Sequence, residues 1–193
     1  MKRIILTIVI AVVFSAFAAA DSITFTLDPA SGNVQGNPGA VVGWGFSLTN
    51  PTSNWVVLDG SSFTGSTVYG TYVDYLSQAF YVAGPSPESS TVSETWNPSA
   101  LLGVGEFDIN STAPPGTEIS GNIMVDYSVY SVDPYDLNFD PSVDTVVADA
   151  TLSDPVQIAV VPEPSSLMLL MTVLLLPLTY PTWRRLLIVR RSQ

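Results

Sequence analysis

The sequence predicts an all-β protein: an antiparallel β-sandwich, Ig-like or jelly-roll-like, with a short apolar segment at each end of the chain. Three observations lead to this class. Apolar and polar residues alternate with a period of two in several segments, Gly- and Pro-containing turns separate those segments, and residues 21–161 contain no long helical stripe. No repeat of 20 to 50 residues is visible, which argues against a solenoid or propeller.

The clearest strands are residues 22–27, 118–131 and 155–161. In the first, Ile23, Phe25 and Leu27 share one face. Such alternation is typical of strands with one buried side. Pro155 is expected at a strand start, where its missing N–H matters least. The longest segment should bury Ile119, Ile123, Val125, Tyr127 and Val129. Further strands are expected at 40–48, 55–58, 77–82 and 104–109.

The charge of the chain is segregated. All six Lys and Arg residues lie within residues 2–3 and 184–191, whereas 16 of the 17 acidic residues lie in residues 21–161. This body should repel nucleic acid and anionic lipid, so neither is an expected partner of the body. The chain also lacks Cys and His, which removes thiol chemistry, imidazole bases and the commonest metal ligands.

Residues 1–20 have the features of a signal peptide. Lys2 and Arg3 precede the apolar residues 4–17, and Ala18, Ala19 and Ala20 supply small residues for cleavage before Asp21. We therefore expect signal peptidase to act here. An uncleaved anchor is the alternative, but the apolar run is short for a membrane span. Residues 21–160 are then the exported domain.

A second apolar segment lies at the other end. Residues 165–183 carry no charge and are long enough for a transmembrane helix, although Pro177 and Pro181 weaken its second half. Positive charge beside a span stays in the cytoplasm. The acidic body should therefore face outward, in agreement with the signal peptide. The basic tail, residues 184–193, contains Arg184, Arg185, Arg190 and Arg191.

The tripeptide Pro162-Glu163-Pro164 lies directly before this span, within residues 161–166. Its two prolines favour extended backbone, which a processing enzyme can reach. Together with the span and the terminal arginines, it resembles the PEP-CTERM sorting signal, which covers residues 161–193. The resemblance implies export by an exopolysaccharide-producing Gram-negative bacterium and processing by the membrane transpeptidase exosortase. The split arginine cluster and the two prolines in the span depart from the family pattern.

The tail allows two other interpretations. A permanent single-span anchor would have the same topology without processing. Residues 176–180, "LPLTY", resemble the LPxTG motif of sortase substrates, but Tyr180 replaces the required Gly and the motif lies inside the span. We discard the sortase interpretation.

The acidic segment "DPYDLNFDPSVD" is a candidate calcium site. Its carboxylates are hard oxygen ligands at irregular spacing, as Ca²⁺ accepts, although the pattern is not an EF-hand. A solvated acidic loop without metal is the default interpretation, so no cofactor is expected beyond this calcium possibility. The candidate ligands are Asp133, Asp136, Asp140 and Asp144.

The body offers little for catalysis. Only carboxylates and tyrosines titrate there, so an enzyme would be a carboxylate-dependent polysaccharide hydrolase that uses residues such as Glu88, Glu94, Glu106 and Asp108. We expect instead a non-enzymatic surface or biofilm-matrix protein with a structural, adhesive or carbohydrate-binding sandwich. Aromatic side chains could stack on an exopolysaccharide, but most should be core. They are Trp44, Trp55, Tyr69, Tyr72, Tyr75, Phe80, Tyr81 and Trp96.

Overall fold

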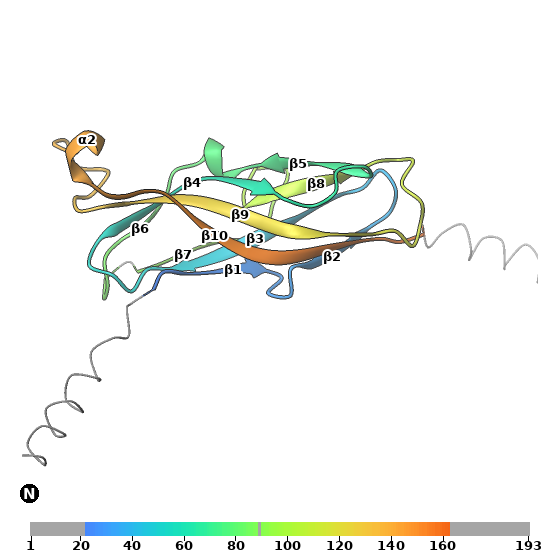
Figure 1. Ribbon diagram of the computed structural model, residues 1–193, viewed down its shortest axis with the longest axis horizontal. Helices are drawn as coiled ribbons and strands as arrows, with labels where there is room; N and C mark the ends of the chain where they lie inside the picture. Colours follow the sequence, from blue (N-terminus) through green and yellow to red (C-terminus); the bar gives the residue numbers. More distant parts are fainter. Residues whose placement is uncertain (1–21, 89, 163–193) are drawn as a thin grey trace, which may run out of the picture.

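The computed structural model describes residues 22–88 and 90–162. These residues form two five-stranded β-sheets that enclose one core (Figure 1). In this part of the chain, no helix has the length and apolarity needed to cross a membrane. The predicted signal peptide and the predicted span, residues 165–183, lie outside the described ranges.

The first sheet is built around β3 (Val41–Thr49), which pairs with β1 (Thr24–Asp28) on one side. On its other side β3 pairs first with β8 (Gly105–Ile109) and then with β7 (Thr91–Glu94). The edge strand β5 (Gly70–Asp74) continues the sheet beyond β8. All these pairs are antiparallel, as the alternating sequence pattern predicted.

The second sheet has the order β2-β10-β9-β4-β6. Its strands are β2 (Asn33–Gly36), β10 (Thr145–Val160), β9 (Glu118–Tyr130), β4 (Trp55–Phe63) and β6 (Tyr81–Ala83). The pairing of β2 with β10 is parallel, so the sandwich is mixed rather than purely antiparallel as expected. A short 3₁₀ turn, η1 (Leu76–Gln78), and one helical turn, α2 (Pro141–Asp144), complete the described elements.

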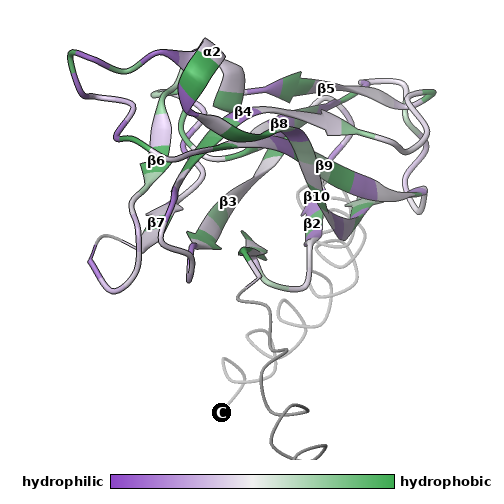
Figure 2. Ribbon diagram, turned by 60° about the vertical axis from the view of Figure 1, so that its left-hand side comes forward, coloured by the Kyte–Doolittle hydropathy of each residue, from purple (hydrophilic) through white to green (hydrophobic). Residues whose placement is uncertain are grey.

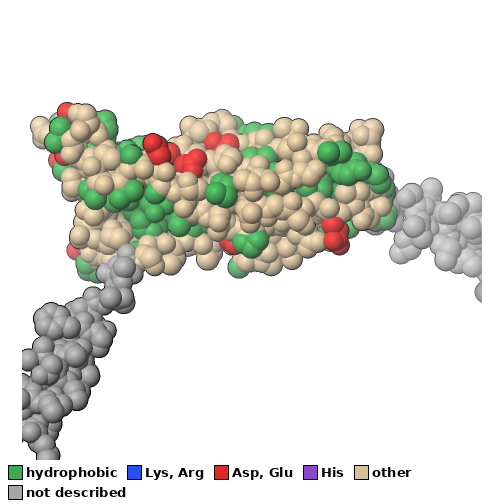
Figure 3. Space-filling model, viewed as in Figure 1, with side chains coloured by type: hydrophobic (Ala, Val, Ile, Leu, Met, Phe, Trp, Pro, Cys, Tyr) green, Lys and Arg blue, Asp and Glu red, His purple; other side chains and the backbone are tan. Residues whose placement is uncertain are grey.

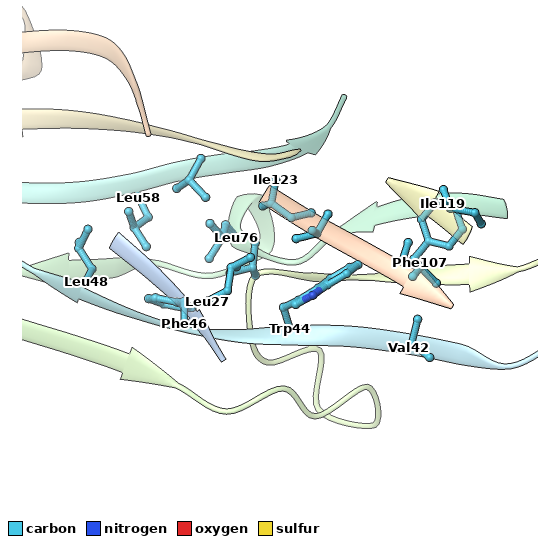
Figure 4. Close-up of a cluster of buried hydrophobic side chains, with 14 of the residues drawn as sticks. Leu27, Val42, Trp44, Phe46, Leu48, Leu58, Leu76, Phe107, Ile119 and Ile123 are labelled. Atoms are coloured by element: carbon cyan, nitrogen blue, oxygen red, sulfur yellow. The ribbon is translucent and has the colours of Figure 1, made fainter. Parts of the chain in front are cut away.

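The core lies between the sheets (Figure 4). Trp44, the largest fully buried side chain, comes from β3, and its indole N–H donates to the Gly32 carbonyl at 2.9 Å. From the opposite sheet, β9 contributes Ile119, Ile123 and Val125, as predicted. Each such side chain removes apolar surface from water, which is the dominant favourable term in folding.

Two sequence-based expectations on strands are wrong. Residues 77–82 do not form one strand: the chain turns at η1, where Leu76 is fully buried and fills the core, and β6 begins only at Tyr81. Pro155 lies inside β10 rather than at its start. Its ring is tolerated there because β2 pairs with β10 only from Gln157 onward, so no ladder bond is lost on that side.

Candidate functional site

The two ends of the sandwich differ in what they present. At one end β10 finishes and the described chain stops; we call this the exit end (Figure 1). At the opposite end the connection from β9 to β10 projects beyond the sheets. We call Phe80 with residues 131–147 the tip.

The exit end holds the start of the predicted sorting motif. Val161 donates its N–H to the Gly36 carbonyl at 2.9 Å, and the Gly116 N–H donates to Val160 at 2.7 Å. Pro162 is exposed directly after this last hydrogen bond. It lines an open hollow of about 320 Å³ together with residues 115–118 and 159–161.

The remaining residues of the predicted processing sites lie outside the described ranges. This holds for both the cleavage residues of the signal peptide and the rest of the sorting signal. They are Ala18, Ala20, Glu163, Pro164, Arg184, Arg185, Arg190 and Arg191.

The four predicted calcium ligands lie in the tip, where each of them accepts a backbone N–H. The Oδ1 atom of Asp133 accepts the N–H of Tyr135 at 2.9 Å, and that of Asp136 accepts the N–H of Asn138 at 2.8 Å. Asp140 caps α2 by accepting the N–H and the hydroxyl of Ser142. These Asx turns explain why the segment forms a loop with a defined path.

The carboxylates of the tip do not converge as a chelating set. Asp144 accepts the N–H of Asp140 at 2.8 Å, but no group of three or more acidic side chains that could hold a metal occurs in residues 22–88 and 90–162. The hydrogen bonds from Ser142 lower the pKa of Asp140, so the carboxylate is ionised at neutral pH. Calcium binding stays a prediction.

The carboxylates considered for hydrolysis differ in solvent exposure. Glu88 is exposed in a loop, whereas Glu106 and Asp108 lie half-buried on the outer face of β8. Burial raises the pKa of Tyr75, and the nearby carboxylates of Glu106 and Asp108 raise it further. The Tyr75 hydroxyl and one Glu106 oxygen are buried without a hydrogen-bond partner among the described residues. Neither Glu106 nor Glu94 lines the exit-end hollow.

Most of the aromatic side chains considered for sugar stacking belong to the core or its margin. Trp44 and Tyr75 are fully buried, and Tyr81 packs edge-on against Phe46 at 5.1 Å. Phe80 is the exception, because 53% of its surface is exposed. Its ring meets Tyr135 of the tip at 5.2 Å and 89°.

Sequence reasoning missed the apolar side of the tip. Leu137, Val143 and Tyr135 are exposed by 102%, 76% and 66%, in the same segment as the four predicted calcium ligands. Figure 2 shows hydrophobic and hydrophilic stretches side by side in the ribbon around α2. The signal was present in the sequence, since large apolar residues inside an acidic, Pro-punctuated loop have no local role. Figure 3 shows apolar and acidic side chains together over this end of the molecule.

Comparison with known proteins does not identify a family for this chain. No protein-family model matches the chain. No curated protein matches it either. Among solved structures, WR4, a C. elegans member of the MSP family, matches with 11% identity and a TM-score of 0.34 over 70% of this chain and 96% of that one.

Two cohesin structures match in a similar way. A type I cohesin–dockerin complex from Clostridium thermocellum has 10% identity and a TM-score of 0.30, over 72% of this chain and 99% of that one. The seventh ScaB type I cohesin from Pseudobacteroides cellulosolvens has 13% identity and a TM-score of 0.29, over 75% and 95%. These scores are too low to transfer a function to this chain.

Proposed function

We propose that the protein is an exported, non-enzymatic surface or matrix protein whose sandwich is carried to the envelope by a C-terminal PEP-CTERM sorting signal. Signal peptidase removes residues 1–20, and exosortase processes the tail. The sandwich then serves as a binding or structural module outside the inner membrane.

One observation carries the proposal: the sorting motif begins immediately where the sandwich ends. β10 ends at Val160, the last backbone hydrogen bond is donated by Val161, and Pro162 is exposed. A processing enzyme needs an accessible, extended backbone, and the prolines at positions 162 and 164 favour one. One residue, Val161, separates the last strand from the predicted processing motif.

Charge supports the same topology. Residues 22–162 contain no Lys or Arg, whereas four arginines follow the apolar segment at 184–191. Positive charge beside a membrane span is retained in the cytoplasm, and long acidic segments translocate readily. An outward-facing acidic body and an inward-facing basic tail satisfy both tendencies.

The experiment measures the intact mass and location of the full chain in a Gram-negative host that has an exosortase. Wild type is compared with Glu163→Ala and with a variant in which the four tail arginines are changed to Gln. We expect wild type to lose the mass of the tail and both variants to retain it in the inner membrane. Glu88→Ala, an exposed carboxylate elsewhere, is the matched control and should be processed normally.

If both tail variants reach the same place at the same mass as wild type, the sorting proposal is wrong. Retention of the tail by wild type itself would indicate a permanent single-span anchor. Incubation of the protein with a polysaccharide panel tests the non-enzymatic part, because release of new reducing ends would identify a hydrolase.

A further inference from the structure

The tip gathers the exposed apolar surface of the molecule. Among the described residues, nine large hydrophobic side chains are exposed, and six of them belong to the tip. Single exposed apolar residues need no explanation, but exposed apolar side chains gathered at one end of a molecule indicate an interaction surface. The six are Phe80, Tyr135, Leu137, Val143, Val146 and Val147.

These side chains sit on a supported scaffold. The ring contact between Phe80 and Tyr135 joins the loop to the sandwich, and Tyr130 of β9 meets Phe139 at 5.0 Å. The Asx turns at Asp133, Asp136 and Asp140 hold the backbone between these contacts. The backbone that carries the apolar groups is therefore held in a defined path, which lowers the entropy cost of binding.

The charge around the surface selects the partner. The tip carries Asp133, Asp136, Asp140 and Asp144, and residues 22–162 contain no Lys or Arg to neutralise them. A partner that covers the apolar groups must bring cations close to these carboxylates, because like charges placed together oppose association. We propose that the tip docks a segment of another exported protein that carries an apolar or aromatic anchor flanked by Lys or Arg.

Two other occupants fit the surface less well. Phe80 and Tyr135 meet edge-to-face at 89°, so they do not form one flat platform for a sugar ring. A second copy of this chain would bring the same negative charge. The exposed edge of β10 at the tip is also irregular. The pairing of β10 with β9 shifts register twice between Thr145 and Ala150, and Asp149 has a positive φ of 52°. Such irregularities discourage edge-to-edge pairing.

This proposal rests on the proposed function only in that the partner must meet the sandwich outside the cytoplasm. The test uses the full chain in phosphatidylcholine nanodiscs, with empty nanodiscs as reference, and a fluorescent peptide Lys-Lys-Trp-Leu-Lys-Lys. Two companion peptides replace the lysines by Glu or the Trp-Leu pair by Ser-Ser. Fluorescence anisotropy gives the Kd, and carbodiimide coupling of peptide lysines to carboxylates, followed by mass spectrometry, locates the contact.

We expect the Lys/Trp peptide to bind in preference to both companions, with weaker binding at high salt and coupling concentrated at Asp133, Asp136, Asp140 and Asp144. Leu137→Ser should weaken binding about tenfold. Asp136→Asn, which keeps the turn acceptor, should weaken it by a smaller factor of about three. The matched controls are Val68→Ser, also an exposed apolar residue, and Glu118→Gln; both should bind like wild type.

Equal binding of the three peptides, or equal loss in the control variants, overturns the proposal. So does protection of the tip by a neutral polysaccharide, or a dimer that Leu137→Ser dissociates. Processing of the tail does not enter this measurement. Peptide binding together with failed sorting would contradict the proposed function alone. Normal sorting without peptide binding would contradict the docking proposal alone.

Discussion

The two halves of β10 show how one strand serves two purposes. Toward the exit end, Val156, Ile158 and Val160 are buried and the strand is paired on both sides, with β9 and with β2. Toward the tip, β10 is paired with β9 alone, and Val146 and Val147 are exposed. The same fold therefore concentrates stability at one end and available surface at the other.

The largest expected effect contrasts the packed core with the tip through aromatic side chains. Trp44→Ala removes a fully buried indole and its hydrogen bond to Gly32, and should lower the free energy of unfolding by about 4 kcal/mol. Tyr135→Ala at the tip should change it by less than about 1 kcal/mol. Urea unfolding of the full chain in detergent measures both. Similar losses in the two variants would contradict the contrast.

A matched pair within β10 tests the same contrast without a change of residue type. Val156→Ala, at 4% exposure, should cost about 2 kcal/mol, because it removes buried methyl groups and leaves a cavity. Val146→Ala, at 53% exposure, should cost less than about 0.5 kcal/mol. Thermal and urea unfolding provide the measurement. A loss at Val146 as large as that at Val156 would mean that the tip half of β10 is covered.

The smallest effect is electrostatic and concerns Asp59 of β4, whose charged neighbours include Asp149 in the tip half of β10. Burial raises the pKa of Asp59, against the hydrogen bond from Ser128, and the charges of Asp149 and Asp126 raise it further. The folded state therefore holds this proton more tightly than the unfolded state. Its contribution to stability is present below the unfolded pKa and is lost as pH rises through the raised folded pKa.

Asp59→Asn, which has no charge to lose, should therefore gain stability relative to wild type as pH rises from 3 to 7. The gain should stay below about 1 kcal/mol, because the group is partly exposed and screened by solvent. The melting temperatures of both proteins across this range provide the test. Asp28→Asn, an exposed carboxylate on β1, serves as the control. A difference that does not vary with pH would contradict the assignment.

The sequence predicted those strands that have one buried face. β9 was predicted because Ile119, Ile123 and Val125 recur at even spacing. β3 is rich in apolar residues, and in β8 buried residues alternate with Glu106 and Asp108. The short strands β5 and β7 were not predicted, because each spans only four or five residues and contains few apolar ones. The tip half of β10 was not predicted for another reason. Most of its side chains are exposed, so its sequence lacks the alternation of apolar and polar residues.

The site was predictable only in part. The local turn chemistry of Asp133 and Asp140 is visible in the sequence, since Asp two residues before a backbone donor commonly forms such turns. Whether several carboxylates meet at one point depends on the path of the loop, which spacing alone does not give. Likewise, the contact of Phe80 with Tyr135 joins residues 55 positions apart and follows from tertiary packing.

The parallel pairing of β2 with the last four residues of β10 has a mechanical consequence. Ladder hydrogen bonds run across the strands, so a pull on the chain beyond Val161 loads the bonds to both neighbours in shear, all at once, instead of peeling them one by one. A load applied between Val161 and the tip would run along the length of the same strand. The C-terminal part of β10 should therefore resist being pulled out of its sheet more strongly than an edge strand that peels away.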